Sequence, residues 1–96
     1  MTRRVLIIDD DEPLCLLLTQ MLKDLRCEVE HETSAARALA RVREVRPDLL
    51  FLDIRMPESN GLDLLESICA TGIPVPVVMM TAHGDLRTAK RAMRLG

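Results

Sequence analysis

The stretch LLFLDIRMPESNGLDLL (residues 49–65) carries the strongest indication of both fold and function. Its apolar run at residues 49–52 has the length and composition of a strand buried inside a sheet. The run ends on a carboxylate, Asp53, and the chain then turns at Met56 and Pro57. A buried strand has no packing use for a carboxylate at its tip. Either Asp53 marks where the chain surfaces, or the strand holds this acid in place for chemistry.

Length and composition restrict the classes of protein that the chain can belong to. Its 96 residues allow one domain with a single small core. Hydrophobic residues make up 48% and charged residues 29%, which is typical of a globular protein. A net charge of −2 gives no field that favours nucleic acid or membrane. No apolar run is long enough to cross a bilayer, so no membrane partner is expected.

The cysteines and the N-terminus indicate the compartment. Cys15, Cys27 and Cys69 are odd in number and lack C-x-x-C spacing, so we interpret them as reduced, partly buried thiols. Residues 1–8 are basic and then apolar, but the apolar run is too short for a signal peptide. We therefore predict a cytoplasmic protein.

The rest of the chain alternates apolar strands with amphipathic helices. Further strands are predicted at residues 5–8 and 76–81, both buried, and at 27–32, where alternating charges indicate a half-exposed edge strand. Apolar stripes with helical spacing cover residues 14–25, 35–45, 62–69 and 86–93. This alternation predicts right-handed βαβ units, and hence an α/β domain with a mainly parallel sheet and helices on both faces.

Polar side chains follow the carboxyl ends of three predicted strands. Asp9 and Asp10 come directly after residues 5–8, Asp53 ends the opening run, and Thr81 ends the last strand. In parallel sheets, ligands bind beyond the carboxyl ends of the strands, where the strand order reverses. We therefore expect these four side chains to meet at one edge of the sheet.

Three carboxylates at one edge repel one another unless protons or a cation compensate them. Mg²⁺ (or Mn²⁺) suits such a group because it takes oxygen ligands and completes its shell with water and phosphate oxygens. No Gly-x-x-x-x-Gly-Lys loop is present, which argues against a bound nucleotide as the source of phosphate. Asp11 and Glu12 precede Pro13, and we interpret them as favourable charges at a helix N-terminus.

Three segments together resemble the receiver domain of two-component response regulators. They are IIDD (residues 7–10), DIRMP (residues 53–57) with Asn60-Gly61 after it, and Thr81-Ala82, in the same order and at the same separations. The resemblance covers the chain from Val5 to its end. It implies a CheY-like, flavodoxin-like doubly wound parallel sheet with strand order 2-1-3-4, and residues 1–96 as one receiver domain.

The resemblance also implies roles for individual residues. Asp53 would be the phosphoacceptor, taking a phosphoryl group from the histidine of a sensor histidine kinase. Asp10 would ligate Mg²⁺ directly and Asp9 largely through water, with Asp53 and the backbone carbonyl of Arg55 as the other protein ligands. The domain would be a signalling switch that assists its own phosphorylation and dephosphorylation, rather than an enzyme.

The resemblance also bears on Arg55 and on the residues at the end of the last predicted strand and directly after it. By the resemblance, Thr81 hydrogen-bonds the phosphoryl oxygens and passes the signal to the following helix, and Ala82 stays small to leave room. Arg55 and His83 each lie two residues past a site residue. They could screen the phosphoryl group from water, or they could be solvated loop side chains, and the sequence does not distinguish these interpretations.

The chain departs from the family pattern at its end. Receivers continue with a fifth strand, which carries a phosphoryl-pairing Lys, and a fifth helix, whereas this sequence stops at Gly96. We therefore expect an incomplete domain with slower phosphorylation and impaired switching. The strand at residues 77–80 would become an apolar sheet edge and the helix at 14–25 would expose apolar surface. Both features predict self-association or exchange of elements between chains.

Residues 81–85 and the last five residues resemble receivers that head multidomain transcription regulators. DNA contact would then require an output domain outside this chain, an inference from likeness alone. One alternative is a receiver-shaped interaction or dimerisation module with impaired phosphorylation, which the missing Lys favours and the three acids oppose. Another is a metal-dependent phosphatase with an aspartyl nucleophile, which would want an acid where Arg55 stands.

Overall fold

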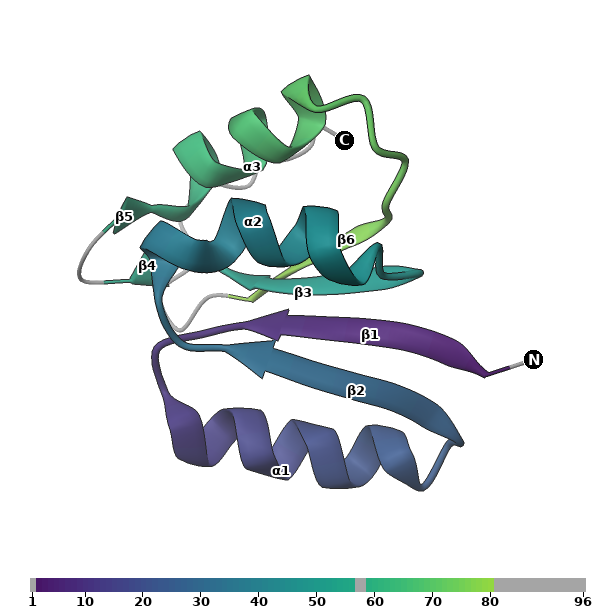
Figure 1. Ribbon diagram of the computed structural model, residues 1–96. Coiled ribbons are helices and arrows are strands. Elements are labelled where there is room, and N and C mark those ends of the chain that lie inside the picture. The colour runs from purple at the N-terminus through teal and green to yellow at the C-terminus, as the bar shows by residue number, and fades with distance from the viewer. Residues whose placement is uncertain (1, 57–58, 81–96) are drawn as a thin grey trace.

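The computed structural model describes residues 2–56 and 59–80, which form four parallel strands, a short hairpin and three helices (Figure 1). In chain order the elements are β1 (Arg3–Ile8), α1 (Glu12–Lys23), β2 (Cys27–Glu32), α2 (Ala35–Val45), β3 (Leu49–Asp53), β4 (Arg55–Met56), β5 (Ser59–Asn60), α3 (Gly61–Ala70) and β6 (Val77–Met80). Within these residues, no helix is long and apolar enough to cross a membrane.

The main sheet has the order β2-β1-β3-β6, and every neighbouring pair of strands is parallel. This is the predicted 2-1-3-4 order, since β6 is the fourth strand of this sheet along the chain. Helix α1 covers one face, whereas α2 and α3 cover the other (Figure 1). The strand order reverses beside β1, so the carboxyl ends of β1 and β3 form the switch point at which ligands bind.

The larger core lies between the sheet and the pair α2 and α3. On the sheet side Leu6, Ile8 and Leu50 are completely buried, and they pack against Val42 of α2 and Ile68 of α3. The stripe predicted for α2 is confirmed, because four of its five members are buried and Leu39 packs against them: Ala35, Ala38, Val42 and Val45. Burial of these aliphatic side chains stabilises each element by roughly 1.5–3 kcal/mol per side chain.

The face under α1 is covered less completely than the sequence predicts. Cys15 is the one buried residue of α1, whereas Leu17, Met21 and Leu25 are 58%, 57% and 72% exposed. The apolar stripe predicted for residues 14–25 is therefore covered only in part: Cys15 packs against the sheet, whereas Leu17 and Met21 of α1, and Leu25 after it, lie largely in solvent. The expectation that this helix exposes apolar surface is confirmed.

The same incomplete cover affects two strands that were predicted to be buried on both faces. Only β1 meets this expectation, with residues 5–8 fully buried. In β3, Leu50 and Leu52 are buried, but Phe51 faces α1 and is half-buried. In β6, Val78 is 42% exposed, because β6 lies at the edge of the described sheet.

Side chains cap two of the three described helices at their starts. The Asp11 carboxylate accepts the Leu14 N–H at the start of α1, and the Asn60 side chain accepts the Leu62 N–H at the start of α3. Ser34 precedes α2 without a side-chain cap. The β4–β5 hairpin, in place of a simple turn, was not predicted.

Candidate functional site

Asp9, directly after β1, is held by three hydrogen bonds. Its N–H donates to the Glu32 carbonyl oxygen at 3.1 Å, and its Oδ1 accepts the Asp11 N–H at 2.9 Å. Its own carbonyl oxygen accepts the Cys15 thiol at 3.4 Å. Burial, together with the negative charge of Asp9, raises the pKa of Cys15 to about 11, so the thiol keeps its proton and remains a donor. Asp9 therefore has a fixed main chain and a side chain that is 3% exposed.

Asp53 ends β3, and the backbone beyond it is held from two sides. The Ile54 N–H donates to the Met80 carbonyl of β6 at 3.0 Å, and the Ile54 carbonyl accepts the Gly61 N–H at 2.9 Å. A Cβ at position 61 would lie 2.4 Å from the Ile54 Cα and 2.7 Å from the Asp53 carbonyl oxygen. Only glycine allows this approach of α3 to the end of β3.

The three predicted acids converge. Asp9, Asp10 and Asp53 each offer a carboxylate oxygen, and these oxygens all lie within 4.8 Å of one another. Burial falls from Asp9, which is buried, through Asp53, which is intermediate, to Asp10, which is exposed. We call this group the acidic trio. It opens to solvent on the Asp10 side, at the carboxyl ends of the strands.

Burial and the closeness of the other two carboxylates raise the pKa of Asp9, the most buried member of the acidic trio. The pKa of Asp9 is raised to about 6, chiefly by burial and further by the charges of Asp53 and Asp10 and a hydrogen bond with Asp53. The Asp11 N–H opposes this rise. Asp9 and Asp10 form no ion pair with any described residue. Several carboxylate oxygens gathered at one point are a donor set that fits a hard divalent cation.

Other predicted site residues are not decided by the structure. Thr81, Ala82 and His83 lie outside the described residues, as does the last predicted helix. Arg55 begins β4, two residues after Asp53. Its carbonyl as a cation ligand and its side chain as a modulator therefore stay predictions, as do the roles of the three acids.

Sequence reasoning missed two residues that hold the site. Cys15 was interpreted only as a packing or surface residue, yet it supports the Asp9 carbonyl. Glu32 belongs to a strand read only for its alternating charges, yet its carbonyl accepts the Asp9 N–H. The position of Glu32 as the last residue of its strand was the one available signal, because parallel strand ends share an edge.

Comparison with known proteins agrees with this fold. The model of the response regulator receiver domain family matches residues 5–96. The chain belongs to this family. A curated relative, the transcriptional regulatory protein ZraR of Escherichia coli (strain K12), is 36% identical over 92 residues, which are 96% of this chain and 21% of that protein.

Another relative, the DNA-binding response regulator MtrA of Mycolicibacterium smegmatis, is 39% identical over 85 residues, which are 88% of this receiver chain and 37% of that protein. The chain thus spans well under half the length of these curated relatives. Its homologues are transcriptional regulators, and the chain corresponds to their receiver domain.

Solved receiver structures have the same fold. The signal receiver domain of a putative Luxo repressor protein from Vibrio parahaemolyticus matches with a TM-score of 0.92 and 30% identity, over 100% of this chain and 74% of that one. The FixJ-N crystal structure matches with a TM-score of 0.86 and 35% identity, over 100% of this chain and 77% of that one. The CheY-like, flavodoxin-like topology predicted from the sequence is confirmed.

Proposed function

We propose that this receiver takes a phosphoryl group from the histidine of a sensor histidine kinase onto Asp53, in a reaction that depends on Mg²⁺ or Mn²⁺. The observation that carries the proposal is the convergence of three carboxylate oxygens within 4.8 Å at the strand ends. Membership of the receiver family supports it. Because Asp53 is half-buried and lies beside Asp9 and Asp10, a role in phosphoryl transfer is favoured over a purely structural role at a turn.

In the proposed step, a carboxylate oxygen of Asp53 attacks the phosphorus, the new O–P bond forms, and the P–N bond to histidine breaks. The electron pair of that bond leaves with the histidine nitrogen, which takes up a proton. The protein has little covalent work in such a transfer, so positioning and charge compensation dominate. Gly61 and the Ile54 backbone position the acceptor, and Asp9 is fixed beside it.

The cation would be held by Asp10 and Asp53 directly, by the backbone carbonyl of Arg55, and by Asp9 largely through water. When bound, it supplies positive charge that offsets the charge of the incoming phosphoryl group. Because Asp9 has a pKa of about 6, its carboxylate is ionised and available at neutral pH. Below that pH, protons compete with the cation for the same oxygens.

The proposed switch passes through the end of β6. Thr81 and Ala82 follow Met80 directly, and the Met80 carbonyl is joined to Ile54 next to the acceptor. Thr81 would hydrogen-bond the phosphoryl oxygens, and Ala82 would leave room for them. Signal transfer to a DNA-binding output domain, in the cytoplasm, completes the proposal. The relatives are DNA-binding and transcriptional regulators, and the odd number of cysteines without C-x-x-C spacing fits a reducing compartment.

Intact-protein mass spectrometry tests the proposal. The chain is incubated with Mg²⁺ and a small acyl-phosphate or phosphoramidate donor, with a parallel sample in EDTA. We expect one added phosphate in the wild type and in Asp24→Asn, which alters an exposed acid at the end of α1. The phosphate should be absent from Asp53→Asn and from the EDTA sample. Unchanged mass in the wild type would contradict the proposal and favour an interaction module, and catalytic turnover of the donor would favour a hydrolase.

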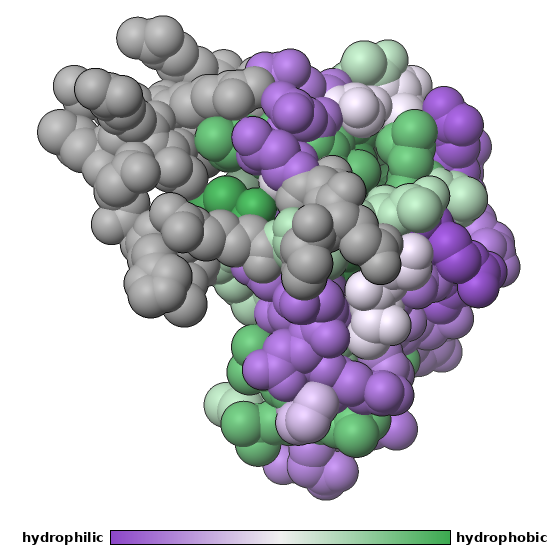
Figure 2. Space-filling view, turned by 90° about the vertical axis from the view of Figure 1, so that its left-hand side faces the viewer, coloured by the Kyte–Doolittle hydropathy of each residue, from purple (hydrophilic) through white to green (hydrophobic). Residues whose placement is uncertain are grey.

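A second function is favoured by exposed apolar side chains on α1 and directly after it. Leu16, Leu17, Met21 and Leu25 are each more than half exposed, and Leu18, Leu22 and Phe51 line a hollow beside them. Figure 2 shows hydrophobic surface at the lower end of the molecule, over α1. We propose that this face, with the β6 edge, contacts a second copy of the chain. Light scattering should show dimers in the wild type and monomers in Leu17→Gln, and a monomeric wild type at high concentration would contradict it.

A further inference from the structure

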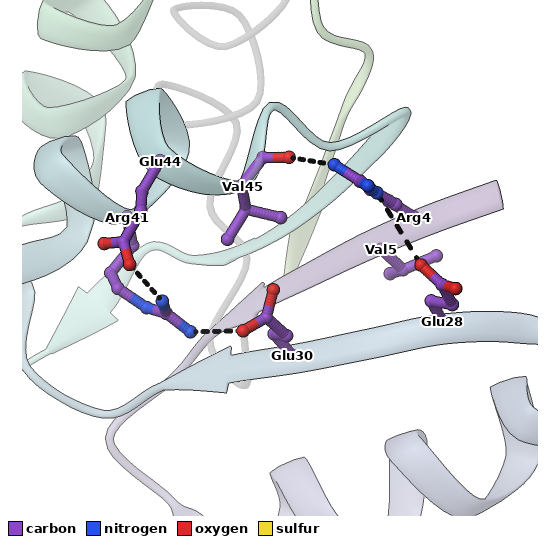
Figure 3. A pocket seen from close by; sticks show the side chains of 7 residues that line it. All are labelled: Arg4, Val5, Glu28, Glu30, Arg41, Glu44 and Val45. Carbon is purple, nitrogen blue, oxygen red and sulfur yellow. Dashed lines mark hydrogen bonds and ion pairs between the residues drawn. The ribbon is translucent and has the colours of Figure 1, made fainter.

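A second charged cluster lies beside the sheet edge, centred on Arg41 of α2. Its guanidinium contacts three glutamates: Nη2 lies 3.1 Å from Glu30 Oε1, Nη1 lies 3.5 Å from Glu44 Oε1, and Nε lies 3.7 Å from Glu32 Oε1. The Arg41 side chain is 16% exposed. Figure 3 shows it reaching from α2 towards Glu30 on β2, at one wall of a pocket of about 260 Å³. We call these four residues the Arg41 cluster.

Glu32 is the member of the Arg41 cluster that reaches the acidic trio. Its side chain is 12% exposed, pairs with Arg41 and Arg37, and accepts the Ser34 N–H at 3.0 Å. Its backbone carbonyl accepts the Asp9 N–H at 3.1 Å. One residue therefore joins a cluster on α2 to the most buried carboxylate of the site.

The position of Glu32 makes this connection important. It is the last residue of β2, and β2 lies at an edge of the described sheet, with a strand partner on one side. The ends of such edge strands open most easily. The side-chain contacts to Arg41 and Ser34 restrain this end, and so keep the Glu32 carbonyl in place for Asp9.

We propose that Glu32, held by Arg41, is a positioning residue for Asp9 and thereby sets the affinity of the acidic trio for a divalent cation. The effect on affinity rests on the proposed function, whereas the effect on the Asp9 main chain does not. Supports of this kind behind cation ligands change metal affinity by about 10- to 100-fold when they are lost.

The test compares Glu32→Gln and Arg41→Ala with Glu28→Gln. Glu28 pairs with Arg4 at the opposite end of β2, far from Asp9 along the strand, so its replacement is a matched control. The first readout is hydrogen exchange of the Asp9 amide by NMR, relative to the other amides of β1. The second is the dissociation constant for Mn²⁺, from electron paramagnetic resonance of the free ion.

We expect both test variants to accelerate Asp9 exchange roughly tenfold and to weaken Mn²⁺ binding about tenfold, with partial rescue in Arg41→Lys. Glu28→Gln should change neither quantity. The inference would be overturned if the Asp9 amide exchanged at the wild-type rate in both test variants, or if Glu28→Gln had equal effects. Faster Asp9 exchange with unaltered Mn²⁺ binding would also overturn it. If the wild type binds no Mn²⁺, the proposed function fails. The Asp9 exchange then decides by itself whether Glu32 positions this residue.

Discussion

The molecule contains two groups of three carboxylates that are built in opposite ways. In the Arg41 cluster, Glu30, Glu32 and Glu44 surround one guanidinium that neutralises part of their charge. In the acidic trio, the carboxylates of Asp9, Asp10 and Asp53 face one another. Asp9 and Asp10 have no cationic partner among the residues that the structure describes.

The difference separates structural charge from functional charge. A guanidinium at the centre of three acids fixes α2 against β2, and its contribution is to stability. Burial and the neighbouring charges of Asp53 and Asp10 raise the pKa of Asp9 to about 6, which is a cost to the folded state at neutral pH. A ligand that brings positive charge to these carboxylates would offset this cost. We therefore propose the acidic trio, and not the Arg41 cluster, as the group that holds the cation.

The largest effect on stability and phosphorylation is expected from Gly61→Ala, which disturbs the backbone beside Asp53 and leaves the Arg41 cluster unchanged. Gly61→Ala forces a Cβ into the backbone of Asp53 and Ile54, so we expect a loss of unfolding free energy of about 3 kcal/mol or more and little phosphorylation. Urea denaturation followed by circular dichroism measures the first, and intact mass the second.

Gly72→Ala is the matched control for this substitution. Gly72 has a φ of +75°, and nothing lies within 4 Å of a Cβ added there. The substitution therefore introduces backbone strain without a steric clash. We expect a loss of about 1–2 kcal/mol with phosphorylation retained. Equal losses of phosphorylation in the two variants would contradict the role assigned to Gly61.

Cation affinity should fall sharply when a carboxylate of the acidic trio is removed, and it should not change when an acid that does not contact Asp9 is removed. Asp10→Asn removes the proposed direct ligand from the acidic trio, and we expect Mg²⁺ affinity to fall roughly a hundredfold, or about 2.7 kcal/mol. Glu30→Gln removes an acid from the Arg41 cluster and should leave affinity unchanged. Isothermal titration calorimetry measures both, and a similar loss in the two variants would remove the distinction between the groups.

Stability without cation should change in opposite directions when one buried acid of each group is neutralised. Asp9→Asn should stabilise the folded chain at pH 7 in EDTA by on the order of 2 kcal/mol, since it removes a carboxylate whose ionisation is penalised. Glu32→Gln should destabilise it, because Arg41 then loses a buried partner. Urea denaturation measures both, and two changes of the same sign would contradict the comparison.

The pH dependence of the wild type follows from the raised pKa of Asp9. The folded state binds this proton more tightly than the unfolded state, so the contribution to stability is full below about pH 4. It is lost as pH rises through about 6. We expect Asp9→Asn to lack this component. A saturating concentration of Mg²⁺ should restore stability to the wild type above pH 6, and the same pH profile in both proteins would argue against a raised Asp9 pKa.

The smallest effect is expected from Arg4→Ala, in the charged pocket of Figure 3. Arg4→Ala breaks a contact of 3.6 Å between two side chains that are about 60% exposed, so we expect a loss below about 1 kcal/mol. Arg41→Ala should cost more, about 1–3 kcal/mol, because it leaves Glu32 buried with a weaker partner. Thermal unfolding followed by circular dichroism ranks the two, and a larger loss in Arg4→Ala would reverse this ranking.

Sequence patterns predicted the site because its geometry follows from topology. A continuous aliphatic run, as at residues 5–8, is typical of a central parallel strand, and parallel strand ends meet at one edge. These two rules were sufficient to predict that Asp9, Asp10 and Asp53 lie close together. The link from Glu32 to Asp9 depends on the pairing register of β1 and β2, which a single sequence does not specify.

The helices show the same limit. Spacing predicted an apolar stripe on α1 but not the roll of the helix, which buries Cys15 and exposes Leu17 and Met21. Helical periodicity gives the width of an apolar face, and the neighbouring elements decide which part of it is covered. In α2, covered by both the sheet and α3, prediction and structure agree.

The most direct test of the central claim locates the phosphoryl group. The chain is incubated with Mg²⁺ and a small acyl-phosphate donor, reduced with borohydride to convert an aspartyl phosphate into homoserine, and mapped by peptide mass spectrometry. We predict homoserine at position 53, its absence from positions 9 and 10, and its loss when EDTA replaces Mg²⁺. Homoserine at the position of another aspartate would contradict Asp53 as the phosphoacceptor. Homoserine at position 53 in EDTA would contradict the dependence of phosphorylation on a cation.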